Sequence, residues 1–261
     1  MGALEDDPLL EEQPAPGVAL LRLNRPAALN ALNLALRRAL ALAVARLEAD
    51  AAIRVIILAG SDKAFCAGAD LKEYVDADPV GIIARDMDRL WDAVAQCRKP
   101  MIAAVRGYAL GGGCELAMHA DLIVAGRHAN FGQPEIGIGL MPGGGATQRL
   151  ARSIGKCRAM KMLLTGRPIA AADAAAMGLV NEVVDDEQVE PAAVDWAREI
   201  ASQPALAARF IKAAVLESMN SGLDAGLRHE RRSFQLLFST GDKTEGIRAR
   251  LEKRPPVFTD R

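Results

Sequence analysis

The first half of the chain alternates between two hydrophobic patterns. Short, almost continuously apolar runs predict buried strands, and longer stretches with an apolar residue every three or four positions predict helices that cover them. The predicted strands are 18–23, 53–59 and 101–105, and the predicted helices are 33–49, 80–96 and 113–119. Strands that alternate with helices indicate an α/β fold whose strands are covered on both faces.

The last third of the chain has a different pattern, in which alanine, leucine, arginine and lysine recur at helical spacing. This pattern predicts helices at 170–177, 189–201, 205–219 and 223–238. The final third is therefore expected to be mostly helical.

Composition narrows the class of protein. The 261 residues, 51% hydrophobic and 25% charged, can build a substantial core, which excludes a disordered chain. The 32 Lys+Arg balance 33 Asp+Glu, and only 4% of the residues are aromatic. We therefore expect no nucleic-acid partner, because binding needs a concentrated basic surface and, for single strands, aromatic side chains for stacking.

The cysteines and histidines form no metal-binding pattern. The four cysteines lack C-x-x-C spacing and the three histidines lack an H-E-x-x-H motif, so no metal is expected. The start of the chain, with Glu5, Asp6 and Asp7, has neither the basic nor the apolar region of a signal peptide, and no apolar run reaches 18 residues. We therefore expect a cytoplasmic protein with no membrane partner.

Two glycine clusters, at 107–113 and 142–145, lie where a strand or loop leads into a helix. Backbone amides at a helix start can bind a ligand, and glycine lets it approach closely, so an oxyanion or phosphate site is expected. Neither cluster continues with the Lys and Ser or Thr of a P-loop, and neither has the G-x-G-x-x-G order of a dinucleotide site. Glycines that only cap or pack remain the alternative.

Two glutamates stand close to these clusters. Glu115 falls in the first turn of the helix predicted at 113–119, and Glu135 follows in a loop with Gly137 and Gly139. Two carboxyl groups beside glycine-rich backbone can serve as general acid and base acting on water. Glu115 can equally well do no more than stabilise the helix dipole, and the spacing does not decide between these interpretations.

Several ordered motifs give the chain a family resemblance over nearly its whole length. They are Asn24-Arg25-Pro26 with Asn30-Ala31-Leu32, the segments 64–72, 99–105, 107–117 and 131–135, Thr147-Gln148-Arg149-Leu150, and Glu252-Lys253-Arg254. Together these motifs resemble the crotonase family of enoyl-CoA hydratases and isomerases, and the whole chain is most similar to bacterial hydratases of that family.

The resemblance implies a fold and an assembly. The implied fold is α/β, a crotonase-like spiral of ββα turns followed by a helical C-terminal trimerisation region. The spiral core would cover residues 1–200 and the helical region residues 201–261. The implied assembly is a homotrimer or a hexamer made of two trimers.

The resemblance also implies a reaction. The backbone amides of Ala69 and Gly112 match the oxyanion hole for the thioester oxygen, and Glu115 and Glu135 match the two glutamates of the family's hydratases. Both glutamates together imply addition of water to trans-2-enoyl-CoA, giving 3-hydroxyacyl-CoA, in fatty-acid or aromatic-acid degradation. No cofactor is implied, because coenzyme A is part of the substrate. An isomerase or a methylglutaconyl-CoA-type hydratase is the enzyme alternative, and an RNA-binding relative is the alternative of another class.

Two segments are implied to bind the CoA moiety. They are the loop of Ala28, Leu29 and Asn30 and the segment that contains Ala67, Gly68, Asp70 and Leu71. Lys72 is the candidate for the CoA phosphates, with a solvated surface lysine as its alternative. Lys253 is a candidate for a ligand held by a neighbouring subunit. The walls of the acyl pocket are expected to come from residues 74–90 and from the C-terminal helices of this or a neighbouring subunit, with the helix around Leu90-Trp91 as a further contributor.

A few residues near the implied site depart from the family pattern or carry reactive groups. Ala146 stands where a further glycine is usual, and His119-Ala120-Asp121 replaces a more usual x-Cys-Asp. Neither Ala146 nor His119 is expected to touch a catalytic atom, and His119 is expected to be a buried structural histidine. Cys66 and Cys114 are expected to be small apolar side chains rather than nucleophiles.

Overall fold

The computed structural model describes residues 7–260. Glu5 and Asp6, which contributed to the expectation that no signal peptide is present, lie outside the described residues. The larger of two sheets has the strand order β1-β2-β3-β5-β7-β10. Its strands are β1 Leu9–Ala15, β2 Val18–Leu23, β3 Val55–Ala59, β5 Met101–Val105, β7 Leu122–Gly126 and β10 Glu182–Val184. From β2 to β10 neighbouring strands are parallel, and β1 pairs with β2 in the antiparallel direction.

A second, smaller sheet follows the order β4-β6-β8-β9. Its strands are β4 Ala64–Cys66, β6 Tyr108–Leu110, β8 Asn130–Gly132 and β9 Ile169–Ala170. The first three are parallel to one another. Each follows a strand of the larger sheet, as β3-β4, β5-β6 and β7-β8, and a helical segment comes next. This repetition confirms the α/β spiral of ββα turns, although no repeat is visible in the sequence.

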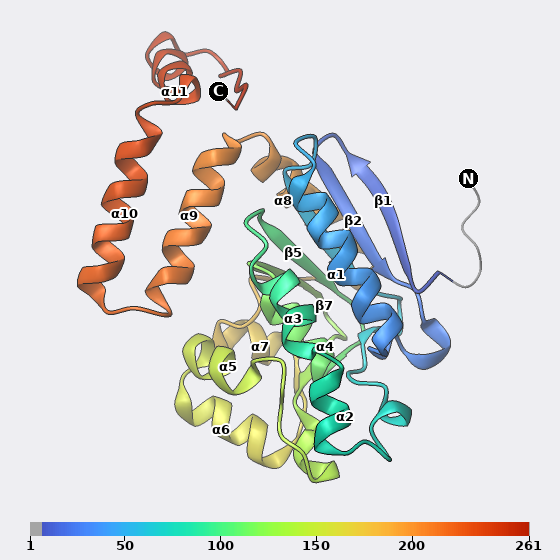
Figure 1. The fold of residues 1–261 in the computed structure, drawn as a ribbon. Helices are drawn as coiled ribbons and strands as arrows, with labels where there is room; N and C mark the ends of the chain where they lie inside the picture. The colour runs from blue at the N-terminus through green and yellow to red at the C-terminus, as the bar shows by residue number, and fades with distance from the viewer. Residues whose placement is uncertain (1–6, 261) are drawn as a thin grey trace.

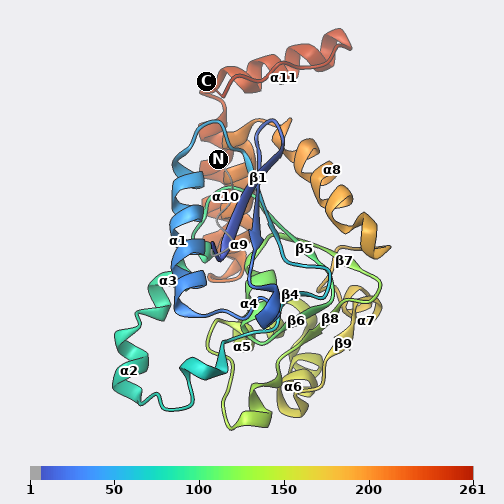
Figure 2. The same ribbon diagram turned by 90° about the vertical axis from the view of Figure 1, so that its right-hand side faces the viewer.

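Helices cover both faces of the larger sheet (Figures 1 and 2). The helix α1 lies on one face and α8 on the other, because the continuously apolar strands point alternate side chains to opposite sides. Ala19 and Leu21 contact the α1 side, whereas Val18 and Leu20 pack with α8. The α-helices are α1 Leu34–Ala49, α2 Pro79–Ala84, α3 Met87–Ala95, α4 Gly112–His119, α5 Ala146–Ile154, α6 Lys156–Thr165, α7 Ala171–Met177, α8 Val189–Ala201, α9 Ala205–Ser218, α10 Leu223–Leu237 and α11 Gly241–Glu252.

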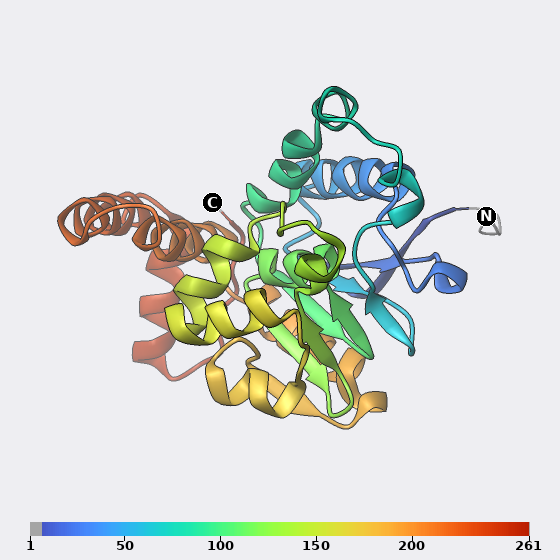
Figure 3. The ribbon, with the colours of Figure 1, turned by 90° about the horizontal axis from the view of Figure 1, so that it is seen from below.

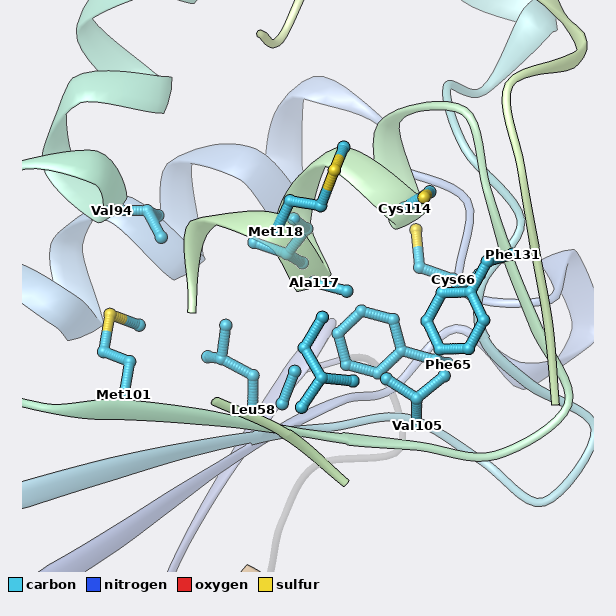
Figure 4. Close-up of a cluster of buried hydrophobic side chains, with 14 of the residues drawn as sticks. Leu58, Phe65, Cys66, Val94, Met101, Val105, Cys114, Ala117, Met118 and Phe131 are labelled. Atoms are coloured by element: carbon cyan, nitrogen blue, oxygen red, sulfur yellow. The ribbon is translucent and has the colours of Figure 1, made fainter. Parts of the chain in front are cut away.

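The core that supports the small sheet is shown in Figure 4. Phe65 of β4 and Phe131 of β8 are fully buried there, together with Leu58 and Val105 of the larger sheet. Met118, on α4, closes the cluster from above in this view. The helix α4 is therefore held on a tightly packed base.

The structure corrects one predicted helix and contains elements that were not predicted, among them the strands β1 and β7 and the helices α5, α6 and α11. The helix predicted at 80–96 is two helices, α2 and α3, because Asp86 adopts a left-handed conformation with φ of 50° that ends the regular hydrogen bonding. The edge strand β1 was not predicted, because its exposed residues Glu11 and Glu12 interrupt the apolar run by which the other strands were recognised.

The C-terminal helices α9, α10 and α11 extend away from the sheets (Figures 1 and 3). A lysine with a largely covered side chain ties α9 to the core: Lys212 Nζ lies 2.8 Å from Asp121 Oδ2 and donates to the carbonyl oxygen of Lys99 at 2.9 Å. Within residues 7–260, no helix combines the length and the apolar character needed to cross a bilayer.

Candidate active site

The candidate site lies at one edge of the small sheet, where three parallel strands end. The segment of Ala67–Asp70 follows β4, Gly111 and α4 follow β6, and Gln133 with Glu135 follow β8. The register pairs Cys66 with Ala109 and Leu110 with Gly132, so the three strand ends stand side by side. Ligands of open α/β sheets commonly bind beyond the carboxyl ends of the strands.

Two backbone amides face each other at this edge. A Cβ placed on Gly112 would lie 3.8 Å from the amide nitrogen of Ala69, and a Cβ placed on Gly68 would lie 3.6 Å from the amide nitrogen of Gly112. Within residues 7–260, neither amide donates a hydrogen bond to the backbone, and Gly112 is the first residue of α4. Both N–H groups can therefore donate to a ligand oxygen, and the helix start favours negative charge there.

Close backbone approach holds this arrangement together. A Cβ on Gly113 would stand only 2.0 Å from the carbonyl oxygen of Cys66, so only glycine lets α4 begin against the end of β4. Gly113 is therefore needed for close packing, which is the alternative to ligand binding that the sequence left open for the glycine clusters.

Glu115 lies in the first turn of α4 with only 3% of its surface exposed. Its Oε1 accepts hydrogen bonds from the amides of Gly144, at 2.7 Å, and Ala146, at 3.0 Å. Burial raises the pKa of Glu115, whereas the two amides and the charges of Arg37 and Arg149 oppose that rise.

The contact between Ala146 and Glu115 corrects an expectation from the sequence. Ala146 was not expected to touch a catalytic atom, but its amide binds the carboxyl group of Glu115 directly. The contact is made by the backbone, so an alanine serves as well as a glycine at this position. Sequence reasoning from side chains could not reveal it.

Glu135 reaches the same place from another strand. It lies in the 3₁₀ helix Pro134–Ile138 that follows β8, and a Cβ on Gly111 would lie 2.8 Å from its Oε1. The carboxyl group is half-buried at the start of α4. Burial raises the pKa of Glu135, and the nearby charge of Glu115 raises it further. The structure therefore brings together the two carboxyl groups whose meeting the spacing left open.

The amide group of Gln133 adjoins Glu135. In the orientation that satisfies both groups, its nitrogen lies 3.2 Å from each carboxyl oxygen of Glu135 and donates to them. The opposite orientation would present the amide oxygen, which can accept from a protonated carboxyl. Gln133 can therefore serve either protonation state of Glu135.

The loop expected to bind CoA is tied to the site by Asn30. Its side chain is fully buried, accepts from the Arg25 amide at 2.9 Å and donates to the Ala64 carbonyl at 2.9 Å. The amide of Ala67 donates to the Leu29 carbonyl at 3.0 Å. Ala28 and Leu29 stay partly or largely exposed. The side chain of Asn30 is thus committed to the fold, and only its backbone can meet a ligand.

The second expected CoA segment continues past Gly68 to the surface. Asp70 pairs with Arg25 at 2.9 Å, so its carboxylate already has a partner. Leu71 and Lys72 are exposed in the 3₁₀ helix Leu71–Glu73. Lys253 directly follows α11, which extends away from the sheets with the other C-terminal helices (Figure 1).

The two buried thiols and the buried histidine near the site are poorly suited to act as nucleophiles or as acid–base groups. Burial raises the pKa of Cys66 and of Cys114 to about 12, which keeps both thiols protonated. His119 is buried, and burial lowers its pKa to about 3. Its ring packs edge-on against Trp91 at 5.0 Å, and neither ring nitrogen has a hydrogen-bond partner within residues 7–260.

Sequence reasoning missed one side chain of the site, Arg37, and named Trp91 only as a contributor to the acyl pocket. A Cβ on Gly144 would lie 2.7 Å from both the Trp91 ring and Oε2 of Glu115, and Cζ of Arg37 lies 5.2 Å from the Trp91 ring centroid. A signal for Arg37 was present, because it falls beside Leu36 and three residues before Leu40, on the apolar face of α1.

A cavity of about 1100 Å³ lies next to the site, bounded by α3, α5 and α9. Trp91, His119 and Gly144 line it, whereas neither Glu115 nor Glu135 does. The residues 7–260 contain no cluster of three or more His, Cys, Asp or Glu side chains able to hold a metal ion.

Comparison with known proteins gives consistent matches. The family described as Enoyl-CoA hydratase/isomerase matches residues 13–261. A probable enoyl-CoA hydratase of Rhizobium meliloti (strain 1021) is 50% identical, covering 94% of this chain and 95% of its own. The 2,3-dehydroadipyl-CoA hydratase of Escherichia coli (strain K12) is 45% identical, and the match covers 94% of this chain and 96% of that protein. A crystal structure of an enoyl-CoA hydratase subunit from Geobacillus kaustophilus HTA426 aligns with a TM-score of 0.94 at 41% identity, covering 97% and 98% of the two chains.

Proposed function

The chain belongs to the enoyl-CoA hydratase/isomerase family, and from that premise we propose that it is an enoyl-CoA hydratase. It adds water across the double bond of a trans-2-enoyl-CoA and gives the 3-hydroxyacyl-CoA. The observation that carries this proposal is the convergence of Glu115 and Glu135 on the start of α4, beside two amides able to bind an oxyanion.

The amides of Ala69 and Gly112 are the proposed oxyanion hole. They would hold the thioester oxygen, on which negative charge develops as the acyl chain passes through an enolate-like state. Donors fixed in place before the reaction stabilise such a charge, and losing one typically costs about 3 kcal/mol in activation free energy.

The surroundings of the two carboxyl groups suggest a division of roles. Burial raises the pKa of Glu115, and the two amides that bind it and the two arginine charges near it oppose that rise. Both burial and the charge of Glu115 favour the protonated form of Glu135. Positive charges lie near Glu115 and a negative charge lies near Glu135, so we assign the role of base to Glu115 and the role of acid to Glu135.

The proposed step conserves every atom of one water molecule. Glu115 takes a proton from water as the water oxygen bonds to the β-carbon, and Glu135 gives its proton to the α-carbon. The carboxyl groups have then exchanged protonation states, and proton exchange with solvent restores them. The partial exposure of Glu135 gives solvent access for this return, and the amide of Gln133 can turn to suit either state.

For the CoA moiety, we propose contact with the backbone at 28–30 and 67–70 and with the exposed Lys72. Asn30 and Asp70 support these segments through their side chains rather than binding the ligand. Replacing Lys72 with alanine is expected to raise KM severalfold and to leave kcat unchanged, because a phosphate contact far from the reacting carbons contributes equally to ground and transition states.

We also propose that the helices after residue 200 join the chain into a homotrimer or a pair of trimers. Large apolar side chains that are exposed in the single chain support this: Ile211, Val215, Leu223, Phe234 and Leu251. Light scattering of the purified protein tests the assembly, and a monomer at micromolar concentration would contradict it.

The activity is tested by following the ultraviolet absorbance of the conjugated enoyl thioester with crotonyl-CoA and identifying the product by mass. Loss of absorbance with a mass gain of one water is expected. Isomerisation of a 3-enoyl-CoA with no hydration of any 2-enoyl-CoA would contradict the proposal and favour an isomerase.

A further inference from the structure

Arg37 is a buried arginine whose guanidinium group reaches both halves of the proposed oxyanion hole. Only 7% of its surface is exposed. Its charge lies near Glu115, but none of the ion pairs formed within residues 7–260 includes it. The space beside it has a volume of about 10 Å³, about that of one water-sized probe, so the side chain is packed in place.

The first contact runs through Leu32 to the amide of Ala69. Arg37 Nε donates to the Leu32 carbonyl at 3.2 Å. The Leu32 backbone bridges the chain on both sides of Ala69: its amide donates to the Gly68 carbonyl at 2.7 Å, and its carbonyl accepts from the Asp70 amide at 3.4 Å. Because successive peptide groups of an extended chain point to opposite sides, the Ala69 amide points away from this bridge. Arg37 therefore binds the same carbonyl that helps to aim the Ala69 N–H.

The second contact is with Gly112, which carries the other proposed donor. A Cβ placed on Gly112 would have three close neighbours: Leu32 Cδ1 at 3.2 Å, Arg37 Nη2 at 3.7 Å and the amide nitrogen of Ala69 at 3.8 Å. The Trp91 ring, whose centroid lies 5.2 Å from Arg37 Cζ, packs against the guanidinium group as well. One planar group is thus held against both segments that supply the donors.

We propose that Arg37 is a positioning residue of the oxyanion hole, which fixes the spacing and direction of the Ala69 and Gly112 amides. The inference rests on the proposed hydratase function. Oxyanion donors are effective because they are fixed before charge develops, and a misplacement of about 1 Å can cost about a hundredfold in rate. This role differs from the effect of the Arg37 charge on Glu115, because it acts on the thioester oxygen and not on the carboxyl group.

Three variants test the role. Arg37→Met removes the contacts of both guanidinium edges but keeps a long side chain, whereas Arg37→Lys keeps the charge and has one nitrogen for two contacts. Arg38→Met is the matched control, because Arg38 is the next residue of α1 and is exposed. With crotonyl-CoA, Arg37→Met should lower kcat by roughly 10- to 100-fold and Arg37→Lys by less, and Arg38→Met should match the wild type.

Binding measures the oxyanion hole without turnover. Butyryl-CoA and S-butyl-CoA differ only in the thioester carbonyl oxygen, which S-butyl-CoA lacks. In calorimetry the wild type should bind butyryl-CoA about fivefold more tightly or better, because two N–H groups hold that oxygen. Arg37→Met should reduce this preference by about threefold or more, by weakening the binding of butyryl-CoA alone. Arg37→Lys should show an intermediate preference, and Arg38→Met should keep the full one.

An unchanged preference for butyryl-CoA in both Arg37 variants would overturn the proposal. If the acid limb of kcat/KM then also moved to higher pH in Arg37→Met, Arg37 would act only through its charge on Glu115. Equal binding of the two ligands by the wild type would reject the oxyanion hole and this role with it. If Arg37→Met does not fold, an unchanged preference in Arg37→Lys rejects the role and a reduced one supports it.

The same measurements separate this proposal from the hydratase proposal. A preference that falls in the Arg37 variants supports the positioning role even if no 2-enoyl-CoA is hydrated. Fast hydration of crotonyl-CoA with an unchanged preference in those variants rejects the positioning role and leaves the hydratase proposal standing.

Discussion

Replacing Glu115 separates its structural role from its chemical role. Its Oε1 accepts from the amides of Gly144 and Ala146, which are both buried. Glu115→Ala leaves these two N–H groups without an acceptor, and each buried unsatisfied donor costs about 1–3 kcal/mol. The free energy of unfolding should therefore fall by about 2–6 kcal/mol, before any loss of packing is counted.

Glu115→Gln should behave differently, because the amide oxygen of glutamine can accept the same two hydrogen bonds. Its free energy of unfolding at neutral pH should be within about 1 kcal/mol of the wild type or higher, since it also removes a buried charge. Urea unfolding followed by circular dichroism measures both variants. Equal stability of Glu115→Ala and the wild type, or equal destabilisation of the two variants, would refute this reasoning.

Three further predictions follow from the site. Because burial raises the pKa of Glu115 above the ordinary value of 4.5, the acid limb of kcat/KM should have its midpoint above pH 4.5. The stability of the wild type relative to Glu115→Gln should fall as pH rises from 4.5 through the raised pKa. An acid limb at or below pH 4.5 contradicts this. Gly111→Ala, with φ of 50° and a Cβ 2.8 Å from Oε1 of Glu135, should lower kcat about tenfold or more, whereas Gly137→Ala, whose Cβ meets nothing within 4 Å, should keep it. Asn30→Ala removes the hydrogen bond that ties the loop at 28–30 to Ala64 of β4 and the one that the Arg25 amide donates to Asn30. It should lower the unfolding free energy by about 2–4 kcal/mol in urea; an unchanged value would show that the loop is held by other contacts.

The long, strongly patterned elements could be predicted from the sequence. The strand at 18–23 and the helix at 189–201 match the structure residue for residue. The strands β4 and β8 have three residues each, too few to show any period. The small sheet that they form could therefore not be derived from periodicity, although the family resemblance implied it.

The candidate site, too, could be predicted from the sequence only in part. Glu115 and Glu135 could be picked out as residues, but their meeting depends on the pairing of β6 with β8, which spacing does not reveal. The binding of Glu115 by the Ala146 amide is a backbone contact and leaves no mark in the sequence. Arg37 did leave one, a charged residue on the apolar face of α1, and could have been found from the pattern.

The most direct test of the two-glutamate account is the kcat of Glu115→Gln and Glu135→Gln with crotonyl-CoA, measured beside Glu199→Gln, an exposed glutamate on α8. Each of the first two variants should lose about a hundredfold or more in kcat and still bind a saturated acyl-CoA, because proton transfer is removed while shape is kept. Glu199→Gln should match the wild type. Near wild-type turnover by either Glu115→Gln or Glu135→Gln would contradict the account.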